Sequence, residues 1–513
     1  MIILGIGGIL NDAAAALMKD GGVVAAIEQK KAARNSRAGL VPLEAIEECL
    51  RIGKVDRDAV TAVALVRPIG AGPETTLHLQ LRAMFPNAQV VLVDHHMAHA
   101  ASAYYASPFD EATVLTLDRQ GDLRCGAKWH GKGARLDLER EMYYPDSFGD
   151  LYSRVTALLG FTPNADEHKV QWMSASGDER FVGVFEKVLG ASHLDQSYFD
   201  RQGGFSDKFF SEIGGREISA PLHPHIARGL QRAVEKAVLN LAGTGENLAL
   251  AGGLAYNALL VASLENSGQW KNVFVQPVSG NAGTALGAAF HTWHSVYKQS
   301  RRSSIGNLCL GPAYAAEDIK QVLENCKLRF RYILTTGELI DAAVQALNEN
   351  QIIAWMQGNM EFGPRALGNR SILASPTNPY STENLNMFIK HREPFRKFAA
   401  SIPAELVAEY FEVGENARFL ATVGKVKAKH RKTFESAILA NDLVRVHAVR
   451  KQDNPLYWNL LHAAGKTAGL PVLYNTSFNL FGDPLVCSPR DAVRSFYSSG
   501  IDAMFVGNFL LQK

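Results

Sequence analysis

Two stretches of this chain repeat one order of strand, turn and hairpin. The first, "MIILGIGGILNDAAAALMKDGGVVAAIEQ" (1–29), contains a β-branched strand, a glycine-rich turn and two apolar strands joined by the hairpin signal "KDGG". The second, "EATVLTLDRQGDLRCGAKWHGKG" (111–133), contains a strand that ends at Asp118, a short turn and a hairpin with glycines. A pattern that occurs twice predicts an internally duplicated domain.

The segments around these units alternate between strand and helix patterns. Apolar residues at helical spacing occur in "LEAIEECLRIG" (43–53) and "ALLVASLENSG" (258–268), whereas "VTAVALV" (60–66) and "AQVVLVDHH" (88–96) are typical of buried parallel strands. Alternation of this kind predicts an α/β layer fold.

The chain is longer than one hydrophobic core usually supports. Its 513 residues favour two domains, and the polar stretch "SRRSSIGN" (300–307) is the predicted linker. We expect a first domain over 1–305 and a second domain, a mixed α/β open twisted sheet, over 310–513.

Composition excludes several classes of protein. Charged residues make up 20% and the formal net charge is +2, so we expect no nucleic-acid partner. No run of 18 apolar residues occurs and the start lacks a basic signal region, so we expect a cytoplasmic protein without membrane segments. The five cysteines show no ligand spacing, which indicates reduced thiols: they are Cys49, Cys125, Cys309, Cys326 and Cys487.

Two glycine-rich turns each precede a helix, a pattern that favours nucleotide binding. They are "LALAGGLAYN" (248–257) and "VSGNAGTALGAA" (278–289), in which glycines let the backbone approach a phosphate or ribose closely. Together with the strand turns at 5–12 and 118–122, they predict an ATPase domain of the actin and sugar-kinase superfamily. The residues expected to bind ATP are Asp118, Gly252, Gly253, Asn257, Asn281 and Gly283.

A histidine cluster lies where a strand passes into a helix, in "VDHHMAHAASAYY" (93–105). His95 and His99 are one helical turn apart, so both imidazoles can hold one metal ion, while the alternative is that they cap the helix or bond within a cleft. Neutral imidazole nitrogens favour zinc or iron over magnesium. A third ligand must come from elsewhere in the chain.

Basic and amide side chains gather in three segments of the second domain, in addition to Arg445 in "LVRVHAV" (443–449). Arginine forks and lysine suit a phosphate, and Ser, Thr and Asn add neutral hydrogen bonds. Each cluster alone could be a solvated surface, but together they predict a pocket for a small dianion. The segments are "MEFGPRALGNRSILASP" (360–376) with Arg365 and Arg370, "FIKHREPFRKFA" (388–399) with Lys390, His391, Arg392 and Arg396, and "VLYNTSFNLFGDPLVCSP" (472–489) with Asn475, Thr476, Ser477 and Asn479.

Five of these motifs, in this order, resemble the ATP-dependent O-carbamoyltransferases of nodulation-factor, cephamycin and aminoglycoside biosynthesis. The motifs are "HHMAHAASAYY", "LAGGLAYN", "MEFGPRALGNRSIL", "KHREPFRKFA" and "NTSFN" with "VCSP". The resemblance covers essentially the whole chain. It implies an actin-like first domain that binds ATP with Mg²⁺ and a metal ion, and a second domain similar to threonylcarbamoyladenylate synthase.

The resemblance also implies a reaction. Carbamoyl phosphate is hydrolysed to carbamate in the basic pocket, carbamate attacks the α-phosphate of ATP, and the carbamoyladenylate passes its carbamoyl group to a hydroxyl or amine of a small-molecule acceptor. Arg365 and Lys390 then stabilise charge on the departing phosphate, and a metal on His95 and His99 polarises the adenylate or the acceptor. Either Asp12 or a histidine of the cluster, such as His95, is the expected base.

Four positions depart from the family pattern. A His-Asp pair in the first turn is here Asn11-Asp12, and the turn usually written DGxG is "DRQG", with Arg119 in place of a small residue. The Asp-Asp-Gly that contributes a carboxylate to the metal is Asn281-Ala282-Gly283, which predicts weak binding of iron or zinc. A Thr-His pair is absent from "AILANDLVRV" (437–446).

Two hypotheses therefore remain at this point. The first is an active carbamoyltransferase. The second is a divergent member whose transfer domain is impaired and which serves as a binding or partner subunit or as a carbamoyl phosphate hydrolase. The sequence leaves the acceptor and the oligomeric state open, a homodimer included.

Overall fold

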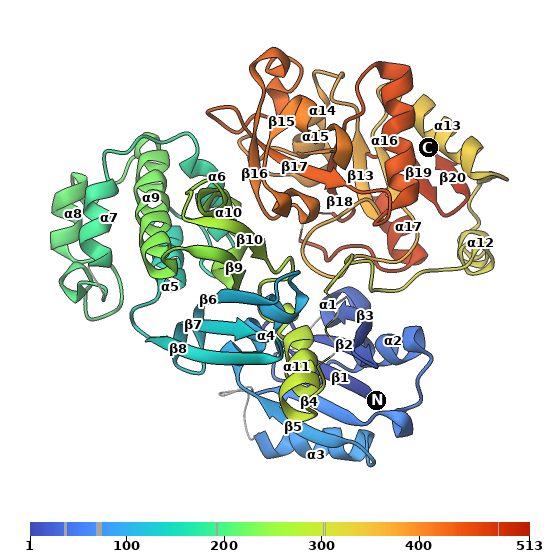
Figure 1. Ribbon diagram of the computed structural model, residues 1–513. Helices are drawn as coiled ribbons and strands as arrows, with labels where there is room; N and C mark the ends of the chain where they lie inside the picture. The colour runs from blue at the N-terminus through green and yellow to red at the C-terminus, as the bar shows by residue number, and fades with distance from the viewer. Residues whose placement is uncertain (35–37, 68–73, 191–192, 301, 303, 481) are drawn as a thin grey trace.

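The computed structural model describes residues 1–513 except 35–37, 68–73, 191–192, 301, 303 and 481. It contains three β-sheets (Figure 1), two of five strands in the N-terminal domain and one of ten strands in the C-terminal domain. Part of the predicted linker, at 301 and 303, lies outside the described residues.

The duplication predicted from the sequence is confirmed by the strand order. The first sheet is ordered β3-β2-β1-β4-β5 and the second β8-β7-β6-β9-β10, so the second repeats the order of the first. In each sheet, the first three strands along the chain pair antiparallel with their neighbours, and the other two strands pair in parallel. The strands are β1 Ile2–Gly7, β2 Ala14–Lys19, β3 Gly22–Glu28, β4 Ala62–Val66, β5 Gln89–Val93, β6 Glu111–Gly121, β7 Arg124–Lys132, β8 Arg135–Tyr143, β9 Gly245–Ala251 and β10 Trp270–Val275.

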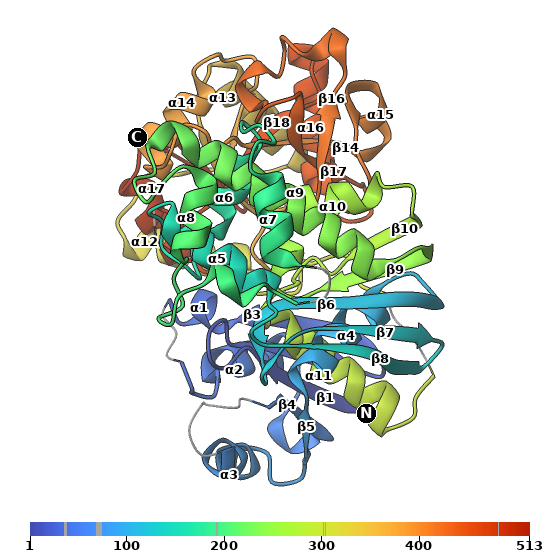
Figure 2. The ribbon, with the colours of Figure 1, turned by 90° about the vertical axis from the view of Figure 1, so that its left-hand side faces the viewer.

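Two alanine-rich helices, α4 (His95–Ala106) and α11 (Thr284–His291), pack between these sheets. Small residues are required here because the backbones nearly touch: a Cβ on Gly287 would lie 1.7 Å from the Ala98 carbonyl oxygen. This close packing sets the ends of β1, β6 and β9 near one another. Remaining helices of the domain are α1 Gln29–Ala32, α2 Leu43–Gly53, α3 Glu74–Met84, α5 Phe148–Leu158, α6 Glu167–Ser174, α7 Val182–Leu189, α8 Asp207–Ile213, α9 His223–Ala242 and α10 Ala258–Glu265. Figure 2 shows helices α5 to α9 gathered on one side of the second sheet.

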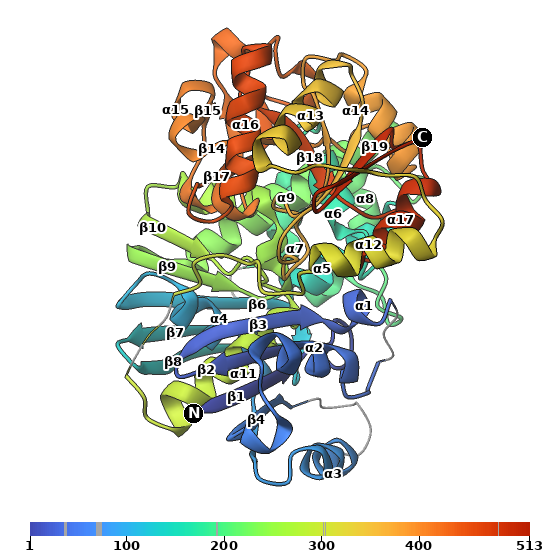
Figure 3. The same ribbon diagram turned by 90° about the vertical axis from the view of Figure 1, so that its right-hand side faces the viewer.

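The C-terminal domain is an open mixed sheet, as the sequence predicts, in the order β11-β20-β19-β12-β13-β18-β14-β17-β16-β15. Helices α13 and α16 cover one face, and α12 and α17 pack with the apolar residues of the other (Figure 3). Its strands are β11 Arg331–Tyr332, β12 Ile353–Met356, β13 Arg370–Ala374, β14 Ala399–Pro403, β15 Phe411–Glu412, β16 Val423–Val426, β17 Leu443–Val449, β18 Leu473–Ser477, β19 Ala503–Val506 and β20 Phe509–Gln512. Its helices are α12 Ala316–Asn325, α13 Thr336–Asn348, α14 Ser381–Asn384, the π-helical η7 Leu385–Lys390, α15 Val407–Tyr410, α16 Pro455–Ala468 and α17 Pro489–Tyr497.

The two domains make direct polar contacts. Glu265, at the end of α10, accepts hydrogen bonds from Asn416 Nδ2 at 2.7 Å and from Thr422 Oγ1 at 2.6 Å. On the opposite domain edge, Arg34 donates to the Leu485 carbonyl oxygen at 2.7 Å. These contacts hold the C-terminal sheet over the ends of the N-terminal strands.

No helix in the described parts of the chain combines the length and the apolar character needed to cross a bilayer.

Candidate active site

Five cationic side chains of the C-terminal domain converge and form what we call the cation cluster. They come from the loop between β12 and β13, from η7 and the loop after it, and from β17: Arg365, Lys390, Arg392, Arg396 and Arg445. Burial lowers the pKa of each of them. The charge of Arg396 lowers the pKa of each of the other four still further, so Arg396 lies within electrostatic reach of all of them.

The positive charge of the cluster is poorly balanced. Burial and the neighbouring Arg396 lower the pKa of Arg392 to about 9, and burial with three arginines holds that of Arg445 well below its usual range. Glu393 lies 3.8 Å from Arg396, but it is also paired with Lys169 at 2.8 Å. Cations forced together in this way are stabilised by a bound anion.

Lys390 joins the cluster to the turn that follows β18. Its Nζ donates to the carbonyl oxygens of Ser477 at 2.5 Å and Asn479 at 3.0 Å, and to Asn479 Oδ1 at 2.7 Å. Asn475 Nδ2 donates to the Ala366 carbonyl oxygen, next to Arg365, at 3.0 Å. Thr476 lies between these residues on β18. The structure therefore brings the segment 475–479, which is the end of β18 and the residues after it, together with the Arg365 loop, as the sequence suggested.

Two of the expected substrate-binding residues lie apart from the cluster. Arg370 is fully buried, and its guanidinium donates to main-chain carbonyl oxygens of Gln357, Gly358, Asn369 and Pro312. His391 is exposed at the end of η7 with φ of 44°. Arg370 thus supports the loop fold, and the structure places neither side chain among the clustered cations.

Helix α6 of the N-terminal domain packs against the cation cluster, which sequence reasoning did not foresee. Trp172 lies under Arg445, with 5.2 Å between the ring centroid and the guanidinium carbon, and Lys169 pairs with Glu393. The nearby charges of Arg396 and Arg365 add to burial and lower the pKa of His168 to about 4. The segment "DEHKVQW" (166–172) gives no signal of this role, because the contacts form only between domains.

A second cluster lies at the start of α4. His95 Nε2 and His99 Nε2 lie 2.9 and 3.2 Å from one carboxylate oxygen of Asp118, and the three ligand atoms fall within 4.8 Å of one another. Burial keeps the pKa of His99 below its ordinary value, which favours the neutral imidazole that binds metals. Asp118, which the sequence assigned to the nucleotide, is thus the third potential ligand of a metal held by the two histidines.

The predicted nucleotide turns lie beside this trio. A Cβ on Gly253 would come within 2.9 Å of Asp118 Oδ1, and a Cβ on Gly252 would lie 2.2 Å from the Leu117 carbonyl oxygen. Gly283, in the 3₁₀ turn Asn281–Gly283, is equally constrained by the Val278 carbonyl oxygen. The glycines bring two backbone turns close to the ends of β6 and β9.

Asn257 has a different local role. Its Oδ1 caps α10 by accepting from Leu260 N at 3.0 Å, and its Nδ2 donates to Gln231 Oε1 at 2.8 Å. The side chain is 6% exposed. In this structure it shapes the turn rather than pointing at open space.

Tyr256 links the two halves of the site. Burial raises its pKa, with added contributions from Asp12 and Glu28, whereas Arg365 acts in the opposite direction. The phenol therefore lies within electrostatic reach of two carboxylates of the first domain and of an arginine of the second. Asp12 itself is paired with Lys30 at 2.6 Å and is about half exposed.

Arg119 lies in β6, which continues to Gly121, and not in a turn directly after Asp118 as the sequence predicts. Its Nε lies 3.2 Å from Asp150 Oδ1, and its side chain is 49% exposed. The arginine of the "DRQG" motif therefore has a partner on α5.

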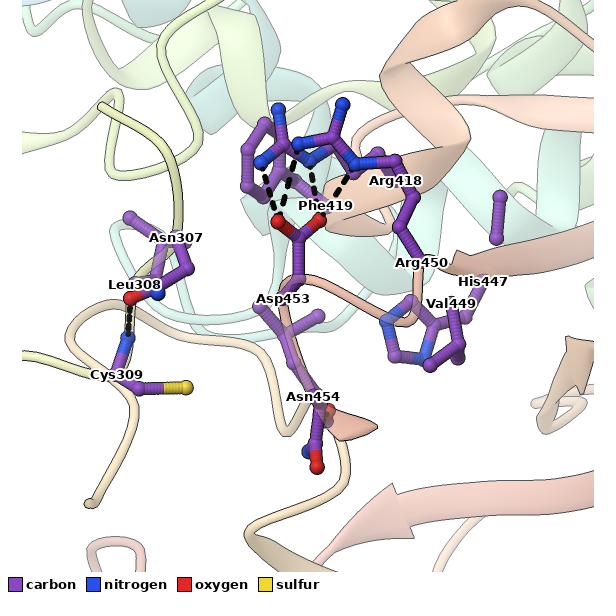
Figure 4. Close-up of a pocket in the computed structure, with 12 residues that line it drawn as sticks. Asn307, Leu308, Cys309, Arg418, Phe419, His447, Val449, Arg450, Asp453 and Asn454 are labelled. Atoms are coloured by element: carbon purple, nitrogen blue, oxygen red, sulfur yellow. Dashed lines mark hydrogen bonds and ion pairs between the residues drawn. The ribbon is translucent and has the colours of Figure 1, made fainter. Parts of the chain in front are cut away.

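A crevice beside the interdomain segment lies next to the Arg365 loop (Figure 4). Arg418 and Arg450 both point at Asp453, each with two hydrogen bonds to its carboxylate. His447 on the crevice wall bonds to Ser401 and burial lowers its pKa to about 3. Both arginines of this crevice therefore share one carboxylate as their partner.

Comparison with known proteins identifies the family of this chain. The family model described as carbamoyltransferase N-terminus matches residues 74–290, and the one described as carbamoyltransferase C-terminus matches residues 344–513. Nodulation protein NolNO of Sinorhizobium fredii is 30% identical over 98% of this chain and 79% of its own length. The 3'-hydroxymethylcephem-O-carbamoyltransferase of Amycolatopsis lactamdurans is 25% identical over 98% of both chains.

Among solved structures, component A of the (R)-2-hydroxyglutaryl-CoA dehydratase of Acidaminococcus fermentans aligns with 57% of this chain and 97% of its own, at 15% identity and a TM-score of 0.39. The sequence relatives, matched over nearly the whole chain, carry the assignment. The chain belongs to the carbamoyltransferase family.

Proposed function

We propose that this chain converts carbamoyl phosphate and ATP to carbamoyladenylate and passes the carbamoyl group to a hydroxyl or amine of a small molecule of secondary metabolism. The observation that carries the proposal is the cation cluster, in which four buried or half-buried cations lie within electrostatic reach of Arg396, while Glu393 and Asp166 are the carboxylates that act on Arg396. A phosphate dianion supplies the missing charge.

The cluster suits the splitting of carbamoyl phosphate. Water adds to the substrate, and carbamate and inorganic phosphate separate with release of a proton. Arg365 and Lys390 stabilise the charge that grows on the departing phosphate, and Arg392, Arg396 and Arg445 hold its remaining oxygens. Asn475, Thr476, Ser477 and Asn479 hold the carbamoyl end through neutral hydrogen bonds or through their backbone.

The second step takes place toward the N-terminal domain. There a carbamate oxygen attacks the α-phosphorus of ATP, and pyrophosphate leaves with Mg²⁺. We assign the nucleotide to the turns at Gly252-Gly253 and Asn281–Gly283, with Asn257 shaping the first turn. Tyr256 lies within electrostatic reach of both Asp12 and Arg365, so we assign it to the boundary between the two halves of the site.

The residues present fit a metal at the start of α4. His95, His99 and Asp118 offer three converging ligand atoms, and the buried His99 Nδ1 has no hydrogen-bond partner among the described residues. When bound there, zinc or iron supplies a Lewis acid for the adenylate or the acceptor. Without a carboxylate at Asn281 we expect this binding to be weak.

The acceptor hydroxyl must lose a proton as it attacks the carbamoyl carbon and AMP leaves. Asp12 is our first candidate for the base, since Asn11 has no titratable group, and His95 is the second. The Asp12 carboxylate lies 2.6 Å from Lys30 Nζ, and its side chain is 45% exposed, so an acceptor hydroxyl can reach it.

A second function is favoured by one observation, the loss of titratable groups at Asn11 and Asn281. A chain with an intact cation cluster and an impaired transfer site would hydrolyse carbamoyl phosphate or act as a partner subunit. We place the protein in the cytoplasm in either case, as the substrates are.

One incubation separates the two functions. The protein is mixed with carbamoyl phosphate, ATP and Mg²⁺, and phosphate and pyrophosphate are measured. Release of both supports the carbamoyltransferase, phosphate alone supports the second function, and release of neither contradicts both enzymatic functions.

A further inference from the structure

A buried ion pair of the N-terminal domain lies under the loop that carries Arg365. Glu28 ends β3 and Lys31 lies in α1, and their Oε1 and Nζ atoms are 2.8 Å apart with side chains 4% and 3% exposed. Burying two charges costs free energy unless further hydrogen bonds complete their coordination.

The C-terminal domain supplies those hydrogen bonds. Lys31 Nζ donates to the carbonyl oxygens of Glu361 at 3.0 Å and Gly363 at 2.6 Å, and Gly363 N donates to Glu28 Oε1 at 2.9 Å. An ammonium group has three donors, and here all three are used. The donors of Lys31 are therefore all used only when this loop is docked on the pair, while Glu28 Oε2 has no hydrogen-bond partner among the described residues.

The docked loop is fixed on both sides of Arg365. Gly363 has φ of 105°, and a Cβ there would come within 2.8 Å of Val278 Cγ2, in a nucleotide turn of the first domain. Beyond Arg365, the carboxylate of Glu361 closes the loop by accepting from three backbone N–H groups: those of Leu367, Asn369 and Arg370 at 2.8, 2.8 and 3.1 Å.

The guanidinium of Arg365 has no such support of its own. In the described portion of the chain, no hydrogen bond or ion pair holds it, and the groups within its electrostatic reach include Tyr256, Arg396 and Arg445. Its position therefore depends on where the backbone of residues 361–370 is held.

We propose that Glu28 and Lys31 are positioning residues that set Arg365 for phosphate binding across the domain boundary. This inference rests on the proposed function of the cation cluster. It makes the affinity of the C-terminal anion site depend on two residues of the other domain that do not touch the anion.

The test compares Lys31→Met with Arg34→Met in the full-length protein. Both changes remove a cation of the same segment that contacts the C-terminal domain, but Arg34 bonds to Leu485 and lies near Asp483 and Asp491, away from the Arg365 loop. Inorganic phosphate is titrated calorimetrically, and KM is measured for carbamoyl phosphate and for ATP.

We expect Lys31→Met to weaken phosphate binding and raise the KM for carbamoyl phosphate by roughly tenfold, since losing one well-placed charged contact has about this effect. The KM of Lys31→Met for ATP should stay within about twofold of the parent value. In Arg34→Met, the KM values for carbamoyl phosphate and for ATP should both stay within this range. Equal effects of the two substitutions on phosphate would overturn the inference.

A double-mutant cycle separates positioning from general stability. If Lys31 acts through Arg365, adding Lys31→Met to Arg365→Ala causes no further loss of phosphate affinity, whereas full additivity would contradict the inference. If Lys31→Met does not fold, Glu28→Gln replaces it, since this variant keeps an acceptor for Gly363 N. We expect Glu28→Gln to lose less phosphate affinity than Lys31→Met and to keep its KM for ATP. An unchanged affinity for phosphate would contradict a role for the ion pair. A parent protein that does not bind phosphate refutes the proposed function instead.

Discussion

Trp172 of the N-terminal domain lies against Arg445 of the C-terminal domain, with 5.2 Å between the ring centroid and the guanidinium carbon. One domain therefore builds part of the wall of a charged site that belongs to the other. A cation over an indole ring contributes about 0.5–2 kcal/mol when it is partly desolvated.

Replacing this indole should weaken the anion site. We expect Trp172→Leu to lower phosphate affinity by roughly three- to thirtyfold, because Arg445 loses its ring partner. Trp458→Leu is the matched control, since Trp458 also carries a cation, Lys451, 5.0 Å from its ring. Calorimetric titration of phosphate checks both variants, and equal affinities would contradict a role for Trp172.

The cation cluster should be a source of instability in the free protein. Burial and Arg396 lower the pKa of Arg365, which means that its charge is disfavoured in the folded state. We expect Arg365→Gln to raise the free energy of unfolding in the absence of anions by about 0.5–1 kcal/mol, and to abolish the extra stability that phosphate gives the parent. Urea titrations with and without phosphate measure this. A less stable free variant would contradict it.

His168 should make the protein sensitive to mild acid. Burial, with Arg396 and Arg365, lowers its pKa to about 4 in the fold, against about 6.5 in the unfolded chain. Between these values only the unfolded chain binds the proton, so the free energy of unfolding falls as pH drops from 6.5 to 4, by at most about 1.4 kcal/mol per pH unit.

The variant His168→Gln should therefore lose part of this acid sensitivity, as urea titrations at pH 4.5, 5.5, 6.5 and 7.5 would show. Saturating phosphate screens the charges of Arg396 and Arg365. It should therefore reduce the difference between parent and variant in the pH dependence of the free energy of unfolding. A parent and variant with the same pH dependence would show that His168 does not face these charges.

The amount of metal bound at the His95–His99–Asp118 site should depend on the number of carboxylates there. We expect less than one equivalent of iron or zinc in the parent, a loss in Asp118→Asn and a gain in Asn281→Asp, by elemental analysis of the dialysed protein. Asp122→Asn is the control, because Asp122 accepts a hydrogen bond from His95 N at 3.3 Å but is not in the ligand set. A full equivalent of tightly held metal in the parent would contradict the prediction of weak binding.

The sequence predicted the fold well where a local signal was strong. The "KDGG" hairpin joins β2 and β3, and "VTAVALV" forms β4, because turn chemistry and apolar runs act within a few residues. The sequence also grouped Arg365 and Arg370 with Lys390 and Arg396. The structure places Arg396 within electrostatic reach of Arg365 and Lys390, whereas Arg370 lies apart from them.

What the sequence missed depends on contacts between distant segments. Nothing in the spacing around Arg370 says that its guanidinium is enclosed by carbonyl oxygens, and nothing around Lys31 says that it bonds to residues 361 and 363. Trp172 and His168 become part of the site only because α6 packs on another domain. The domain limits at 305 and 310 and the roles of the site residues stay predictions.

The release of phosphate from carbamoyl phosphate by the parent, Arg365→Ala and Arg418→Ala tests the central proposal most directly. Arg418 is a matched arginine of the same domain that pairs with Asp453, outside the cation cluster. We expect release by the parent and by Arg418→Ala, and none by Arg365→Ala, while ATP binding to all three stays nearly unchanged. If Arg365→Ala releases phosphate at the rate of the parent, the cation cluster is not the site where carbamoyl phosphate is split.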